Sequence, residues 1–334
     1  MTKKTVGIIF GGKSTEHHES IRATRILYQY AIEPLEHKYR FKYFYLTKKN
    51  QWATANDSFR IIQKQKHQDE VDPHRICDLH LVDVLYSTCM GGCGENGNLA
   101  GLADIFQIPL IGCGILPSAL CLDKPLTKLV AEQFGIPTVK SITVNKDENV
   151  SDILSAIDEN IGYPLFAKPT NLGTCAYVFK ATSEEEFRKK WAKSTKNNDC
   201  SPHYLIEQFI PNIEVRVFIY QDAKGEYHLN DGYVTTLKEE ILLKGGSLFK
   251  HLENSLEKSD RKTIRQYAIE LFEALKIKDY ARIDFFIDSE DGTIYFNEAN
   301  TQPFLSTFNI KLMKKDGLEF SEFLDLMIQK NLKA

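Results

Sequence analysis

Residues 281–303 read ARIDFFIDSEDGTIYFNEANTQP, two apolar stretches on either side of a short acidic segment that ends in glycine. A three-residue loop at 290–292, with the glycine in the left-handed conformation, predicts an antiparallel hairpin. This pairing sets Asp284 opposite Glu298, on one face of the hairpin. Because residues two apart in a strand point the same way, Ile294 and Phe296 are expected on that face as well.

Polar side chains at the end of this hairpin form a candidate metal site. Asn300 lies two residues after Glu298, so Asp284, Glu298 and Asn300 bring together two carboxylates and an amide oxygen. Such hard oxygen ligands suit Mg²⁺ that is shared with phosphates. Arg282, expected opposite Asn300, is suited to stabilise charge on a transferred phosphoryl group. Alternating charges are also typical of a solvated strand face, which is the alternative interpretation.

The rest of the chain predicts an α/β protein with more than one domain. Its 334 residues are 43% hydrophobic, enough to bury more than a single core. The first 120 residues alternate strand and helix patterns, which favours a parallel α/β domain. Two further units follow, and we expect domains at 1–118, 119–209 and 210–334. A helix that includes Lys124 is expected to end at Gly135 and Pro137.

Charge and cysteine content exclude several classes of protein. The formal net charge of −3 is spread along the chain, so neither nucleic acid nor a membrane surface is an expected partner. No run of 18 apolar residues is present. The cysteines number seven, and no secretory signal pattern begins the chain, which favours a reduced cytoplasm. Cys89 and Cys93 lack a second ligand pair for zinc and are expected to be buried thiols.

Residues 6–20, VGIIFGGKSTEHHES, match the phosphate-binding P-loop pattern. However, the apolar residues 8–10 fall where a P-loop needs its loop, which favours a strand, a tight turn at Gly11-Gly12 and then a helix. Such a helix start can hold a ligand carboxylate, and Glu16 in its first turn can hold an ammonium, as a free amino acid requires. The alternative is that Glu16 only interacts with the helix dipole.

Four further charged residues are candidates for a nucleotide site. Lys124 opens a helix, and Lys168 follows an apolar run that Pro169 ends, so either lysine is placed to contact phosphate. Glu207 closes the apolar run YLIEQFI, and Glu214 follows it. A carboxylate at such a crossover can hold ribose hydroxyls, although exposed acids and surface lysines are common.

Seven motifs, taken in order, are similar to those of the D-alanine:D-alanine ligase family of the ATP-grasp superfamily. They are FGGKSTEHHES, GENGNLAG, IPLIGCGILPSALCLDKPLTK, FAKPTNLGT, LIEQFI, ARIDFF and NEANTQP, and the resemblance runs nearly end to end. It implies an N-terminal parallel α/β (pre-ATP-grasp) domain and two α+β domains that clasp ATP. It also implies that ATP phosphorylates the carboxylate of one amino acid, and that the amine of a second attacks the acyl phosphate.

The resemblance implies roles for the matching residues, and a homodimer. Glu16 would hold the ammonium of the first amino acid, and Arg282 would stabilise the tetrahedral intermediate. A mobile lid that includes Thr174 would cover the phosphates. The remaining residues would bind cofactors: Lys124, Lys168 and the candidate Lys244 at the phosphates, Glu207 and Glu214 around adenine and ribose, and Asp284, Glu298 and Asn300 at two Mg²⁺ ions, with Mn²⁺ as the alternative.

The sequence departs from the family mainly on the substrate side. Met90 stands where the family has a histidine, and Thr174 and Cys175 replace the paired serines of the lid. Tyr177 stands where a lid glycine is expected. Beyond NEANTQP, a small glycine and a serine of the family align with Phe304 and, less securely, Asn309. The segment 236–253 occupies the place of the family's tyrosine-bearing loop.

These features predict an ADP-forming carboxylate–amine ligase with an altered acceptor site. The altered lid residues also leave open a nucleotide-binding regulator or sensor with little catalytic activity. A P-loop NTPase is the third interpretation.

Overall fold

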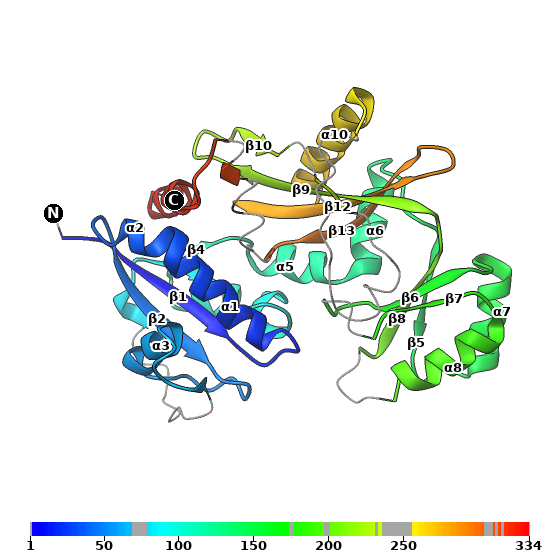
Figure 1. Ribbon diagram of the computed structural model, residues 1–334, viewed down its shortest axis with the longest axis horizontal. Coiled ribbons are helices and arrows are strands. Elements are labelled where there is room, and N and C mark those ends of the chain that lie inside the picture. The colour runs from blue at the N-terminus through cyan, green and yellow to red at the C-terminus, as the bar shows by residue number, and fades with distance from the viewer. Residues whose placement is uncertain are drawn as a thin grey trace.

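The computed structural model contains three sheets, whose strands follow one another in the sequence as an N-terminal, a second and a third group (Figure 1). The residues that it describes are 2–68, 79–173, 177–196, 201–230, 233–235, 256–303, 310, 313–314 and 317–333.

The N-terminal sheet is parallel, as the alternation of strands and helices predicts. Its strands are β1 (Thr5–Gly11), β2 (Arg40–Leu46), β3 (Val84–Ser87) and β4 (Leu110–Ile111), in the order β2-β1-β3-β4. Alternate residues of β1 enter two different apolar cores, with Ile8 and Phe10 on one face and Ile9 on the other. Burial on both faces explains why this strand is a continuous apolar run.

Helices cover this sheet and lead out of it. The helix α1 (His17–Leu27) continues as a π-helical segment, Tyr28–Ile32, and α2 (Glu33–Leu35), α3 (Ala55–Ile62) and α4 (Asn98–Ile105) follow. Beyond β4, the chain forms α5 (Ile115–Leu122) and α6 (Lys124–Gln133). The side chain of Asp123 caps α6 by accepting from the Leu126 amide at 3.1 Å. The helix therefore begins at Lys124 and ends before Gly135, as predicted.

The second sheet is antiparallel and carries its helices on one face. It consists of β5 (Ser141–Asn145), β8 (His203–Gln208), β6 (Leu165–Pro169) and β7 (Phe179–Ala181), in that spatial order. The helices α7 (Val150–Asn160) and α8 (Glu184–Ser194) bury Ile153, Phe187 and Trp191 against it. Asn149 and Ser183 cap these two helices through their side chains.

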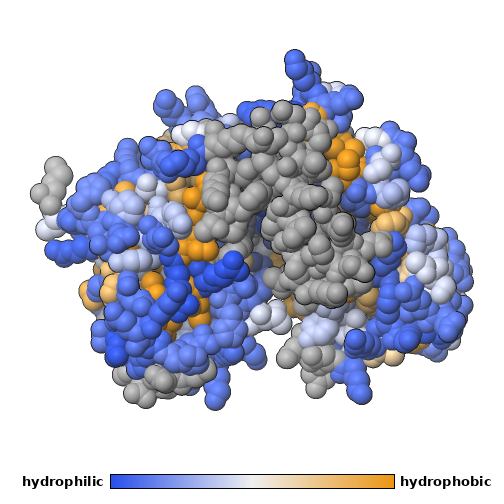
Figure 2. Space-filling model, viewed as in Figure 1, coloured by the Kyte–Doolittle hydropathy of each residue, from blue (hydrophilic) through white to orange (hydrophobic). Residues whose placement is uncertain are grey.

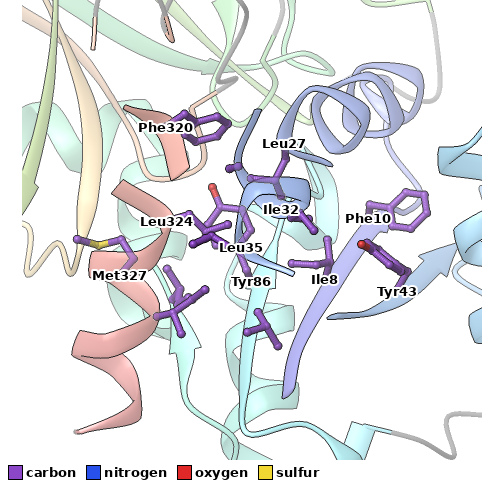
Figure 3. Close-up of a cluster of buried hydrophobic side chains, with 14 of the residues drawn as sticks. Ile8, Phe10, Leu27, Ile32, Leu35, Tyr43, Tyr86, Phe320, Leu324 and Met327 are labelled. Carbon is purple, nitrogen blue, oxygen red and sulfur yellow. The ribbon is translucent and has the colours of Figure 1, made fainter. Parts of the chain in front are cut away.

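The third sheet combines β9 (Asn212–Gln221), β10 (Tyr227–Leu229), β11 (Tyr233–Thr235), β12 (Tyr280–Asp288) and β13 (Ile294–Asn300), all paired antiparallel. The helix α10 (Lys258–Ala274) packs on its apolar face. The last helix, α12 (Phe320–Leu332), instead joins the core of the N-terminal sheet. Figure 3 shows Leu324 of α12 beside Leu35, and Phe320 and Met327 of the same helix belong to this core.

The surface agrees with the composition. Hydrophilic residues cover much of the described surface in the view of Figure 2, and apolar residues gather in small areas. None of the helices in the described ranges has the length and apolarity that crossing a bilayer requires. Among the described cysteines, Cys89, Cys113 and Cys121 are buried free thiols, which confirms the expectation for Cys89, whereas Cys93 is a free thiol that is only half-buried.

Candidate active site

The β12–β13 hairpin confirms the predicted pairing of polar residues but reaches it by a different route. Asp284 lies opposite Glu298, and Arg282 lies opposite Asn300. The loop has four residues rather than three, since the Asp288 amide donates to the Thr293 carbonyl at 2.9 Å. The extra loop residue shifts the register by one, and a β-bulge after Asp284 shifts it back.

The bulge overturns the expected position of two apolar residues. Ile294 and Phe296 are buried in the core under α10, on the face opposite Glu298 and Asn300. The bulge adds one residue, Asn297, to β13 and so inverts the alternation of side chains between Phe296 and Glu298. The site is therefore more polar than the sequence pattern predicts.

Asp284 lies at the centre of the polar face and is fully buried. Arg282 donates to both of its oxygens, with Nε 2.8 Å from Oδ1 and Nη2 2.7 Å from Oδ2. A second guanidinium, that of Arg216 on β9, lies directly opposite in the sheet, with Nε 3.8 Å from Oδ2. The buried carboxylate of Asp284 therefore lies next to two cationic side chains, those of Arg282 and Arg216.

Glu298 lies where lysines from the middle of the chain approach the hairpin. Asn300 donates to its Oε1 at 3.1 Å, and the Lys124 Nζ lies 4.0 Å from its Oε2. Burial raises the pKa of Glu298, but the surrounding cations, above all Lys124, outweigh this effect and lower the pKa to about 2. The carboxylate is therefore ionised at neutral pH, as a metal ligand must be.

Lys124 and Lys168 reach this site from different elements. Lys124, the first residue of α6, also donates to the Leu172 carbonyl at 2.9 Å. Lys168, on β6, donates to the Asn297 side chain at 3.1 Å, so the bulge residue links the second and third sheets. The structure brings together the two lysines and the hairpin acids that the sequence analysis names.

Glu207 is buried, and a lysine faces each of its two carboxylate oxygens. Its Oε1 lies 2.5 Å from Lys128 Nζ, and its Oε2 lies 2.6 Å from Lys168 Nζ. Although burial raises its pKa, the two lysines lower the pKa of Glu207 to about 2. Glu214, the other acid expected near the nucleotide, is also buried and accepts from Arg216 Nε at 3.0 Å.

Glu16 lies in the turn before α1, which begins at His17. Its amide donates to Ser14 Oγ at 3.1 Å, and Ser14 Oγ donates to the Met90 carbonyl at 2.6 Å. Gly91 and Gly173 pass so close that a Cβ on either would lie 2.8 Å from a carboxylate oxygen of Glu16. Segments near residues 90 and 173 thus converge on this carboxylate, although they are distant in sequence.

The N-terminal turn is not a P-loop. Gly7 lies inside β1, and a Cβ there would clash with Leu85, so it is a packed strand residue. Gly11 and Gly12 have φ of +88° and +92°, which only glycine adopts readily and which turn the chain toward Glu16. This confirms that the strand extends through Gly7 to the turn.

Several expected residues lie outside the described part of the chain: Thr174, Cys175, Lys244, Phe304 and Asn309. Tyr177 is described, and its φ is +62°. A side chain with a Cβ is disfavoured in this conformation, whereas glycine, which the family places here, adopts it without strain.

Sequence reasoning missed three charged residues of the site: Glu95, Lys128 and Arg216. Burial, together with Glu16, raises the pKa of Glu95 to about 7. Lys128 lies one helical turn after Lys124, and Arg216 lies two residues after Glu214 on the same face of β9. The positions of Lys128 and Arg216 could have been predicted, because residues four apart in a helix or two apart in a strand lie on the same face.

Two solved structures that share this fold are of ligases. The D-Ala:D-Ser ligase VanG from Enterococcus faecalis matches with a TM-score of 0.83 and 23% identity, covering 99% of this chain and 100% of that one. The D-alanine–D-alanine ligase from Coxiella burnetii matches with a TM-score of 0.82 and 22% identity, covering 100% and 95%. With lysines and acidic side chains gathered between two antiparallel sheets, the protein has the ATP-grasp fold of these structures.

Sequence comparison assigns the protein to one family within this fold class. The family models described as D-ala D-ala ligase N-terminus and C-terminus match residues 5–113 and 130–329. A D-alanine–D-alanine ligase of Ruminiclostridium cellulolyticum is 29% identical, and one of Chlorobaculum parvum is 30% identical; the matches cover 98% of this chain and 95% and 96% of those relatives. This chain belongs to the D-alanine–D-alanine ligase family, and is an ATP-dependent ligase that forms a peptide bond.

Proposed function

We propose that the protein joins two amino acids, converts ATP to ADP and phosphate, and proceeds through an acyl phosphate. The observation that carries this proposal is the convergence of Lys124 and Lys168 on Asp284, Glu298 and Asn300. Cations and oxygen donors arranged in this way suit a polyphosphate with its metal ions. D-alanine is the first substrate to test, because the curated relatives are named for it.

The donor set fits Mg²⁺, since two carboxylates and an amide offer only oxygen atoms. We propose that Asp284, Glu298 and Asn300 hold two Mg²⁺ ions, with Mn²⁺ as an alternative, and that these ions neutralise phosphate charge when bound. In this proposal, the lysines that bind phosphate oxygens are Lys124, Lys168 and Lys244. Glu207 and Glu214 line the adenine and ribose pocket.

Arg282 and Glu16 act on the amino acids in this proposal. The guanidinium of Arg282 is held by Asp284 and lies on the same face as the metal ligands, so it can stabilise an oxyanion without moving far. The carboxylate of Glu16 holds the ammonium of the first substrate. Thr174 belongs to the lid that keeps water from the acyl phosphate.

The acceptor site is proposed to differ from that of the family's usual members. Met90, which replaces a histidine of the family, is buried and lines a small cavity with Leu27, Thr88 and Phe320. The apolar side chain of Met90 cannot make the polar contact that a histidine would offer at this position. The bulky Phe304 and the replacement at Asn309 are further reasons to test acceptors other than D-alanine. D-serine is one of them, because the VanG ligase is named for it.

The protein is further proposed to be a homodimer with the domains 1–118, 119–209 and 210–334. Consecutive helices α4, α5 and α6 contact one another and expose large apolar side chains: Ile105, Ile115, Leu116, Leu126, Leu129 and Phe134. Large apolar side chains exposed on neighbouring helices are typical of an interface. Leu129→Glu should shift the mass measured by light scattering from dimer to monomer, whereas Leu326→Glu on α12 should not.

We also propose a cytoplasmic location and no nucleic-acid or membrane partner, in keeping with the dispersed charge and small substrates. Localisation of a tagged full-length chain tests the first part. Retention on nucleic acid or on anionic vesicles would contradict the second.

Release of ADP from Mg-ATP tests the function. The panel comprises single and paired D- and L-amino acids, with D-alanine plus D-alanine and D-alanine plus D-serine included. We expect release well above background with at least one pair, and no release above background with any pair would contradict the proposal. The family and its named relatives give no support to the alternative of a regulator with little activity.

A further inference from the structure

A buried lysine that the proposed function does not use lies behind the phosphate-binding lysine. Lys128 is 3% exposed, and its Nζ donates to the Val139 carbonyl at 2.7 Å and to Glu207 Oε1 at 2.5 Å. The other oxygen of Glu207 lies 2.6 Å from Lys168 Nζ. Of the two lysines on this carboxylate, Lys168 is the more exposed, with 13% of its side chain accessible against 4% for Lys128.

The charges of these three groups do not cancel. One carboxylate between two ammonium groups leaves a net charge of +1, and Lys168 is the member that faces the candidate phosphate site through Asn297. Without Lys128, Glu207 and Lys168 would form a closed, neutral ion pair. A phosphate would then have to compete with Glu207 for the ammonium of Lys168.

We propose that Lys128 is a positioning residue for phosphate binding, which neutralises Glu207 and so leaves Lys168 available to the nucleotide. The inference rests on the proposed function, because it assumes that Lys168 binds phosphate. It assigns no contact between Lys128 and the nucleotide. Lys128 acts through the carboxylate of Glu207.

The test compares two ligands that differ in phosphate, ADP and adenosine, by isothermal titration calorimetry on the full-length protein. Lys128→Met keeps the length of the side chain and removes its charge. We expect the dissociation constant for ADP to rise roughly tenfold or more, as for loss of a charged hydrogen bond, while that for adenosine stays within about twofold. Equal weakening of both ligands, or no weakening of either, would overturn the inference.

A matched control is available in α12. Lys330 also donates to a backbone carbonyl, that of Gln221 at 2.8 Å, and its Nζ forms an ion pair with the Oδ1 of a buried carboxylate, Asp279, at 3.1 Å, away from the site. Lys330→Met should lower thermal stability but leave the ratio of the two dissociation constants unchanged. A comparable change in the ratio would show that the effect of Lys128→Met is a general loss of structure.

A double-mutant cycle tests whether Lys128 acts through Glu207, and its comparison within the Glu207→Gln background does not need the single Lys128→Met variant. In the Glu207→Gln background there is no buried carboxylate to capture Lys168, so adding Lys128→Met should change the ADP-to-adenosine ratio by less than about twofold. Full additivity of the two substitutions would contradict action through Glu207. If wild-type protein binds neither ligand, the proposed function fails, whereas binding with an unchanged ratio in Lys128→Met refutes only this inference.

Discussion

The acid stability of the second sheet should depend strongly on Glu207. Burial raises the pKa of this carboxylate, but Lys168 and Lys128 lower it to about 2, against an ordinary value of 4.5. A depressed pKa means that the ionised group stabilises the fold above pH 4.5, and that this contribution is lost as the pH falls toward 2. The contribution is about 3 kcal/mol at neutral pH, and about 2 kcal/mol of it is lost between pH 7 and about pH 3.

Urea unfolding followed by tryptophan fluorescence measures this contribution. Trp191 is 3% exposed against Phe187 and Tyr204 in the core of the second sheet, and Trp52→Phe would leave it as the sole reporter. The difference in unfolding free energy between the parent and its Glu207→Gln variant should shrink by about 2 kcal/mol from pH 7 to about pH 3.

A difference that stays constant with pH would refute this prediction. In that case the carboxylate does not gain its stability from the two lysines in the folded state. Glu159→Gln is the control, because Glu159 is exposed on α7, which packs on the same sheet, and within the described ranges it forms no ion pair with a lysine. It should leave the acid dependence unchanged.

Three further substitutions test other parts of the site and fold. Gly173→Ala should place a methyl group against the Glu16 carboxylate. It should raise the KM for the first amino acid roughly tenfold (~1.4 kcal/mol) and leave the affinity for ADP unchanged. An unchanged KM would argue against the proposed role of Glu16 in binding that amino acid. Glu298→Gln should weaken Mg²⁺ binding at least tenfold (~1.4 kcal/mol) by calorimetry, whereas Glu290→Gln at the hairpin tip should not. Phe323→Ala should lower unfolding free energy by about 3–5 kcal/mol, because the ring is fully buried, and a loss below about 1 kcal/mol would contradict its core position.

The sequence predicts the elements that depend on local signals. Gly292 adopts the left-handed conformation with φ of +74°, as predicted, whereas the predicted pairing of Asp284 with Glu298 is reached because the extra loop residue and the bulge offset each other. The helix that starts at Lys124 and the turn at Gly11-Gly12 follow from a proline, a cap and glycines within a few residues. These signals act over one turn of helix or one pleat of strand, which a sequence pattern can resolve.

What the sequence misses depends on residues that are distant along the chain. The bulge at Asn297 and the extra loop residue cancel in the register, so the pairing at Glu298 gives no sign of either. The pairing of Lys128 with Glu207 joins residues 79 positions apart. Packing of α12 against the N-terminal sheet, seen at Phe320 in Figure 3, likewise has no local sequence signal.

The central claim is that this chain forms a peptide bond and converts ATP to ADP. Mass spectrometry of the reaction with Mg-ATP and an amino-acid pair, combined with an ADP assay, tests it most directly. We predict a dipeptide and ADP in equal amounts for at least one pair, and loss of both products in Glu298→Gln. ADP without dipeptide, or neither product with any pair, would contradict the claim.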